Sequence, residues 1–131
     1  MIRSLFPVLI FLTQIVNPIA FQGDIVDSLS LLFKSANSKE ISKNFSSSVE
    51  LKVNEDEDVY SKAQAEQIIR EFFNKTTPVN STVVHLINTN PNYRFGVLSL
   101  STKNGKFRVA ITLKKTSNAF FITELRIEPE K

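Results

Sequence analysis

Alternation of apolar and polar side chains in the second half of the chain is the feature that most limits the fold, since a half-buried strand requires this period of two. The dipeptide Asn104-Gly105 lies between two alternating segments and predicts a tight hairpin with a type I′ turn. Taken as a two-residue loop, it places Leu98 opposite Ile111 and Leu100 opposite Val109. Apolar side chains then face apolar side chains, so we expect an antiparallel sheet with one buried face.

A second hairpin is expected around Ser117-Asn118-Ala119, taken as a three-residue loop. This loop pairs Ile111 with Leu125 and Val109 with Ile127, which continues the apolar face across a third strand. Its reverse face pairs opposite charges, and an earlier strand over residues 81–88 completes a run of four. The predicted inward side chains are Leu98, Leu100, Val109, Ile111, Leu113, Leu125 and Ile127.

Three amphipathic helices and one further strand are expected before these four strands. Apolar residues recur at helical spacing in residues 24–33, 38–45 and 61–73. Asp24 and Ser61 are the predicted N-caps, the latter in a capping box with Gln64. Residues 49–53 alternate as a strand does. The predicted order is therefore helix, helix, strand, helix and four strands, an α+β layout with the helices covering one sheet face.

The first twenty residues differ from the rest of the chain. A basic Arg3 precedes an apolar run from Leu5 to Val16, and Asn17-Pro18-Ile19-Ala20 follows, which is typical of a secretory signal peptide. The run is too short to span a bilayer as a mature helix, although an uncleaved anchor is the alternative. We therefore expect an exported protein, periplasmic or extracellular, with one domain at residues 24–128 and no stable membrane span after cleavage.

Composition argues against several kinds of chemistry. The chain has no Cys, so disulfides, thiolate metal sites and cysteine nucleophiles are excluded. A formal net charge of +3, spread along the sequence, does not predict a nucleic-acid partner. The chain has only three glycines and no phosphate-binding loop, and no Ser-His-Asp arrangement follows from spacing. We expect no cofactor, no catalytic residue and no metal ligand.

Four consecutive acids, Glu55 to Asp58, raise the hypothesis of a calcium site, because hard cations take several carboxylate oxygens. Adjacent acids alternate in direction, however, and the segment lacks the glycine and the distal glutamate of an EF-hand. We interpret the acids as a solvated turn whose negative charge precedes a helix N-terminus.

Candidate residues for ligand binding are Tyr60, His85 and Tyr93. His85 is the only histidine and is expected to share a strand face with Val83 and Ile87, without an identified carboxylate partner. The two tyrosines lie at element ends, where a ring can stack and a hydroxyl can bond. The reverse face of the sheet carries more apolar area than a solvated face requires, which predicts a homodimer. Its expected interface consists of Phe95, Val97, Arg108, Ala110, Ile122, Glu124 and Arg126.

The sequence also resembles a family of small secreted bacterial proteins known as a domain of unknown function, whose fold is similar to nuclear transport factor 2. The resemblance rests on the segments VELKV, VYSKAQAEQIIREFF, NGKFRVAITLKK and FITELRIE, and it covers Ile25 to Glu128. It implies a cystatin-like α+β cone, with three N-terminal helices packed on a curved, mostly antiparallel sheet. Relatives of this fold include isomerases and dehydratases that place Asp, Tyr or His in the cone, whereas the predicted inward positions here are aliphatic.

Two function hypotheses follow. The first is a non-catalytic, exported binding or assembly module, whose partner is an unknown envelope protein or a small apolar ligand. The alternative is a cone-pocket enzyme or small-molecule carrier of the isomerase or dehydratase type, with an uncharacterised substrate. The two hypotheses differ in what the cone contains, because proton transfer needs an acid or a base within hydrogen-bond reach.

Overall fold

The computed structural model describes residues 24–131 of the chain, so the signal peptide predicted at residues 1–20 lies outside the described residues. Its helices are α1 (Ile25–Lys34), α2 (Ser38–Ser42) and α3 (Lys62–Lys75). Its strands are β1 (Phe45–Val53), β2 (Asp56–Ser61), β3 (Pro78–Ile87), β4 (Tyr93–Thr102), β5 (Gly105–Thr116) and β6 (Ala119–Pro129). Within residues 24–131, no helix is long and apolar enough to cross a membrane.

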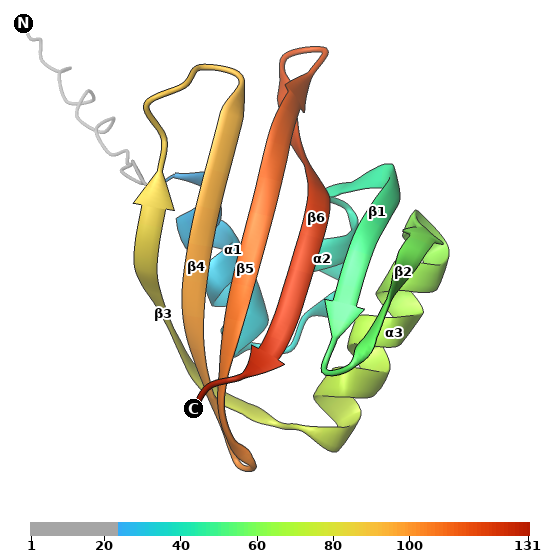
Figure 1. The fold of residues 1–131 in the computed structure, drawn as a ribbon, viewed down its shortest axis with the longest axis vertical. Coiled ribbons are helices and arrows are strands. Elements are labelled where there is room, and N and C mark those ends of the chain that lie inside the picture. The colour runs from blue at the N-terminus through green and yellow to red at the C-terminus, as the bar shows by residue number, and fades with distance from the viewer. Residues whose placement is uncertain (1–23) are drawn as a thin grey trace, which may run out of the picture.

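The six strands form one curved sheet in the order β2-β1-β6-β5-β4-β3, and all three helices lie on one face of it (Figure 1). Only the β1–β6 pair is parallel, and the other four neighbouring pairs are antiparallel. This arrangement confirms the predicted α+β layout of helices on a curved, mostly antiparallel sheet. The face that carries the helices is called the inner face below, and the opposite face is called the outer face.

One strand is missing from the predicted order. Residues 55–58 are not a solvated turn throughout, because Asp56 begins β2, which pairs with β1 along its length. Only Asn54 and Glu55 form the turn, and Asn54 has the positive φ of 57° that closes it. Since β2 is an edge strand with mostly exposed residues, it lacks the apolar alternation that reveals a strand in a sequence. The Ser61 cap and its capping box with Gln64 are confirmed.

The predicted register of the β4–β5 hairpin is wrong by two residues. The turn consists of Lys103 and Asn104, so that Thr102 faces Gly105 and Leu98 faces Val109. A type I′ turn would require positive φ at both turn residues, but here the positive φ, 111°, belongs to Gly105. Because a shift of two residues keeps every side chain on its own face, the predicted inward positions survive the error.

The β5–β6 hairpin has the predicted pairing but a different turn. Ile111 faces Leu125 as expected, yet the loop contains only Ser117 and Asn118, with positive φ angles of 52° and 69°. The shorter loop and the expected pairing of Ile111 with Leu125 are compatible because β6 contains a bulge at Thr123, where the register shifts by one residue. The bulge turns Ile122 to the inner face, where it is fully buried. The prediction that Ile122 belongs to the outer face is therefore wrong.

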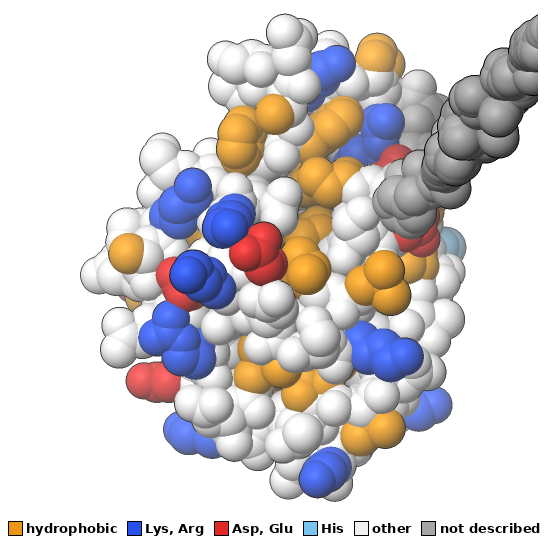
Figure 2. Space-filling view, turned by 180° about the vertical axis from the view of Figure 1, so that it is seen from behind, with side chains coloured by type: hydrophobic (Ala, Val, Ile, Leu, Met, Phe, Trp, Pro, Cys, Tyr) orange, Lys and Arg blue, Asp and Glu red, His pale blue; other side chains and the backbone are white. Residues whose placement is uncertain are grey.

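The core fills the space between the inner face and the helices. All seven predicted inward side chains are fully buried. Phe72 of α3 packs edge-to-face on Phe107 of β5 at 5.1 Å between ring centroids, and Phe73 packs on Phe33 of α1 at 5.8 Å. Seen from the helix side, hydrophobic side chains also line a hollow between polar ones (Figure 2). Each fully buried aliphatic or Phe side chain stabilises the fold by roughly 1.5–3 kcal/mol.

Gly96 of β4 allows α1 to approach the sheet closely. A Cβ atom at this position would lie 2.5 Å from Cγ1 of Val26, which is fully buried on α1. We expect Gly96→Ala to lower the free energy of unfolding by about 1–3 kcal/mol through overpacking, as measured by denaturant titration. The double variant Gly96→Ala/Val26→Ala should lose less than the sum of the two single losses. Strictly additive losses would contradict this contact.

Candidate functional site

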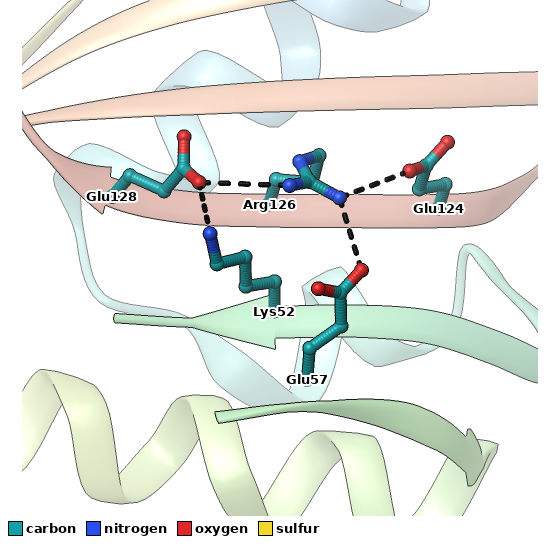
Figure 3. A network of polar contacts seen from close by, with 5 residues as sticks. All are labelled: Lys52, Glu57, Glu124, Arg126 and Glu128. Carbon is teal, nitrogen blue, oxygen red and sulfur yellow. Dashed lines mark hydrogen bonds and ion pairs between the residues drawn. The ribbon is translucent and has the colours of Figure 1, made fainter. Parts of the chain in front are cut away.

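The outer face carries a network of five charged side chains from three strands (Figure 3). Arg126 of β6 lies at its centre, with Nη1 3.1 Å from a carboxylate oxygen of Glu57 and 3.5 Å from one of Glu124. Its Nη2 lies 3.6 Å from Glu128, which also accepts a 2.6 Å hydrogen bond from Nζ of Lys52. The sheet register brings these groups together, because Lys52 of β1 faces Arg126 on one side and Glu57 of β2 on the other.

The network is only partly shielded from solvent. The hydrogen bond from Lys52 lowers the pKa of Glu128, against a smaller opposing effect of desolvation. At Arg126 burial opposes the charged form, but the hydrogen bond to Glu57 and the fields of the three carboxylates together raise the pKa. Because the side chain of Arg126 is 34% exposed, each pair contributes only about 0–1 kcal/mol to stability. The arrangement orients charge on the surface and provides no neutral acid or base.

The other half of the outer face, over β3, β4 and β5, combines a small apolar cluster with polar and basic side chains. Val97 and Ala110 face each other across β4 and β5 and are nearly fully buried, although all the described helices lie on the inner face. Phe95 is half-buried beside them, and Ile87 of β3 faces Phe95 with 50% of its surface exposed. Of the predicted interface residues, Phe95, Val97, Arg108, Ala110, Glu124 and Arg126 lie on this face, and Ile122 does not.

A groove of about 600 Å³ lies between the β1–β2 hairpin and the C-terminal half of α3. It is lined by Leu51, Val53, Asn54, Glu55, Asp56, Glu57, Asp58, Tyr60, Ile68, Glu71, Phe72, Lys75 and Thr76. Tyr60 is thus the predicted ligand-binding residue that lies in a groove. Among residues 24–131, no group of three or more acidic or histidine side chains is arranged to hold a metal ion.

The three candidate ligand-binding residues do not form one site. Tyr60 lines the groove, His85 is exposed on the outer face opposite Val97, and Tyr93 begins β4 opposite Lys114. The expectation that His85 shares a face with Val83 is wrong, because the β3 register shifts between these two residues. Val83 therefore packs against the core while His85 points outward.

Several residues at these sites were not predicted from the sequence. The network is completed by Lys52, Glu57 and Glu128. Their contacts depend on the parallel β1–β6 pair, which no local sequence pattern predicts. Asp56 and Asp58 reach the groove because β2 is a strand. If residues 56–60 are read as a strand, Asp56, Asp58 and Tyr60 share one face and Glu57 points to the other. This alternation was the one sign in the sequence that Asp56 and Asp58 lie beside Tyr60.

Comparison with known proteins places the chain among structurally characterised relatives. The family model described as "Domain of unknown function (DUF4783)" matches residues 26–128. A DUF4783 protein of Bacteroides uniformis is 26% identical, with a TM-score of 0.77 over 82% of this chain and 99% of that chain. A DUF4783 protein of Bacteroides ovatus is 30% identical, with a TM-score of 0.74 over 79% of this chain and 93% of that chain. No curated protein matches the sequence.

Proteins outside this family share the same fold. A domain of unknown function with a cystatin-like fold from Nostoc punctiforme is 8% identical, with a TM-score of 0.65 over 81% of this chain and 73% of that chain. At this identity the similarity shows the fold alone. The resemblance to a family of unknown function with a cystatin-like, nuclear transport factor 2-like fold is confirmed.

Replacing Lys52 with Met should raise the pKa of Glu128 towards its ordinary value, because the largest lowering effect is the hydrogen bond from Lys52. The stability that Glu128 contributes is present above its unfolded-state pKa and is lost as the pH falls through its lower folded-state pKa. Carboxyl carbon NMR titration measures the shift. Lys39→Met, on the exposed surface of α2, is the matched control and should leave it unchanged. An unaltered Glu128 titration in Lys52→Met would contradict the assigned cause.

Proposed function

Because the chain belongs to the DUF4783 family, a domain of unknown function, its family assigns no activity, and we propose a function from the geometry. The chain is a non-catalytic, exported bacterial assembly module that forms a homodimer through the outer face of its sheet. The basic and apolar pattern of residues 1–20 supports export, and therefore a periplasmic or extracellular location. The single observation that carries the proposal is the composition of the outer face.

The apolar cluster over β3, β4 and β5 provides the contact area. Ile87 is half exposed, Phe95 is partly exposed, and both border the buried pair Val97 and Ala110. A sheet face of this kind gains from being covered, at about 25 cal/mol per Å² of apolar surface removed from water. Covering by a second sheet is a common solution, with the two sheets about 10 Å apart.

The charges on the same face support a second copy of the chain as the occupant. The outward positions of β5 carry three exposed bases, Lys106, Arg108 and Lys114. The neighbouring half over β1 and β6 carries an excess of acid, from Glu50, Glu124 and Glu128 against Lys52 and Arg126. In a two-fold interface each contact occurs twice, so the bases of each copy can meet the acids of the other.

The content of the cone favours this reading over the alternative of a cone-pocket enzyme or carrier. The core cluster beneath the sheet consists of apolar side chains, from Val26 to Ile127. Proton-transfer catalysis requires an acid or a base within about 2.6–3.2 Å of the substrate. The predicted inward positions of the sheet are filled with aliphatic residues and offer none.

We expect a dimer at micromolar concentration, measured by sedimentation equilibrium. Ile87→Glu should raise the dimer dissociation constant at least about tenfold, because it puts a carboxylate into the apolar contact. Leu31→Glu is the matched control, since Leu31 is 61% exposed on α1, on the helix side of the sheet. This variant should dimerise as the parent chain does.

Salt provides an independent measure of the same dimer. If β5 bases meet β1 and β6 acids across the interface, dissociation should increase between 50 mM and 500 mM salt. Arg108→Glu should weaken the dimer and reverse part of this dependence. A parent chain that stays monomeric at every concentration would overturn the proposal, and so would an Ile87→Glu variant with undiminished association.

A further inference from the structure

The groove beside α3 has an apolar floor. Leu51 and Phe72 lie beneath it but are only 1% and 5% exposed, so they add almost no surface to the groove. Val53, Tyr60 and Ile68 pack on the same core but are only half-buried, so each leaves part of its side chain in the groove. The volume of about 600 Å³ lies within the range of roughly 300–1,000 Å³ that is usual for ligand pockets. The groove is therefore large enough for an apolar side chain and its flanking backbone.

Carboxylates from both walls surround this floor. Asp56 and Asp58 of β2 face Val53 and Leu51 of β1, and the inner-face direction of those two residues puts both aspartates on the side of α3. Glu71 contributes from α3 itself. All three are exposed, and none of them forms a salt bridge within residues 24–131. Glu57, by contrast, points to the outer face and pairs with Arg126.

The negative charge of the groove is local. The whole chain has a formal net charge of +3, yet the groove lining contains four acidic residues besides the paired Glu57 and, of the basic ones, Lys75 alone. The groove also extends to the C-terminal end of α3, at Lys75 and Thr76. The last carbonyl groups of a helix carry a partial negative charge that favours cations. The two electrostatic contributions have the same sign and attract a positively charged partner.

From the apolar floor and its charge complementarity we propose that this groove binds an extended basic peptide segment, in which an apolar side chain is flanked by Lys or Arg. The apolar side chain contacts Tyr60 and Ile68, and the flanking cations face Asp56, Asp58 and Glu71. A neutral ligand would bury part of these carboxylates without compensating their charge, which is costly. A bare metal ion would leave the apolar floor unused, and the acids are not grouped to coordinate one.

The probe is an amidated, acetylated peptide with the sequence Lys-Leu-Lys-Phe-Lys, titrated by calorimetry at low salt. We expect binding to the parent chain and a dissociation constant about tenfold higher for Asp58→Asn/Glu71→Gln, because this variant loses two pairs between a carboxylate and a cation of the peptide. Asn retains the acceptor for the backbone N–H of Val59, which lies 2.7 Å from Oδ1 of Asp58. Glu40→Gln is the matched control, because Glu40 lies on α2 in a pair with Lys43. It should bind the peptide as tightly as the parent chain.

Two altered peptides separate charge from apolar contact. A peptide with Glu in place of Lys should not bind, and an all-Lys peptide should bind more weakly than the probe. Equal affinity of the probe for the parent chain and the Asp58→Asn/Glu71→Gln variant would overturn the proposal. Failure of the probe to bind the folded parent chain at millimolar concentration would also overturn it.

The groove proposal does not depend on the homodimer. Ile87 lies on β3 and the groove lies beside β2, at the opposite edge of the sheet (Figure 1). The Ile87→Glu variant should therefore bind the probe with the affinity of the parent chain, whatever its state of association. Loss of probe binding in Ile87→Glu would contradict this independence and place the binding site at the outer face.

Discussion

The packing of α3 against the concave inner face is the contact on which the rest of the structure depends. Phe72 and Phe73 join this helix to β5 and to α1 through two edge-to-face contacts. Such pairs contribute about 0.5–1.5 kcal/mol beyond their buried area. Because α3 begins at Lys62, directly after the last residue of β2, its docking also positions that edge strand. The groove between β2 and α3 is a consequence of this short connection.

The fold separates an apolar interior from two polar surfaces. Seven inward positions of β4, β5 and β6 are filled by fully buried aliphatic side chains, whereas Arg94 of β4 faces Leu113 and pairs with Asp24 at 2.8 Å. The Thr123 bulge helps to keep the surfaces distinct, because it directs Ile122 inward and leaves Glu124 in contact with Arg126. In an unbulged strand Ile122 and Glu124 would share a face.

One acidic segment serves both surfaces. Successive residues of a strand point to opposite faces, so Glu57 joins the Arg126 network while Asp56 and Asp58 face α3. The network keeps a small excess of acid, because Arg126 and Lys52 balance two of its three carboxylates. The groove keeps a larger excess, since Lys75 alone of the basic residues lines it and Asp56, Asp58 and Glu71 form no salt bridge within residues 24–131.

The sequence by itself determined the presence of three helices, seven inward side chains of β4 to β6 and the Ser61 cap, because periodicity and capping are local. It also determined the family, through segments spread over the domain. Only the tertiary structure decided that β2 is a strand, that Ile122 faces the core and that Lys52 meets Glu128. Each of these depends on a partner distant in sequence. An exposed edge strand needs no apolar alternation, a bulge reverses alternation, and a parallel pair joins segments that no turn connects.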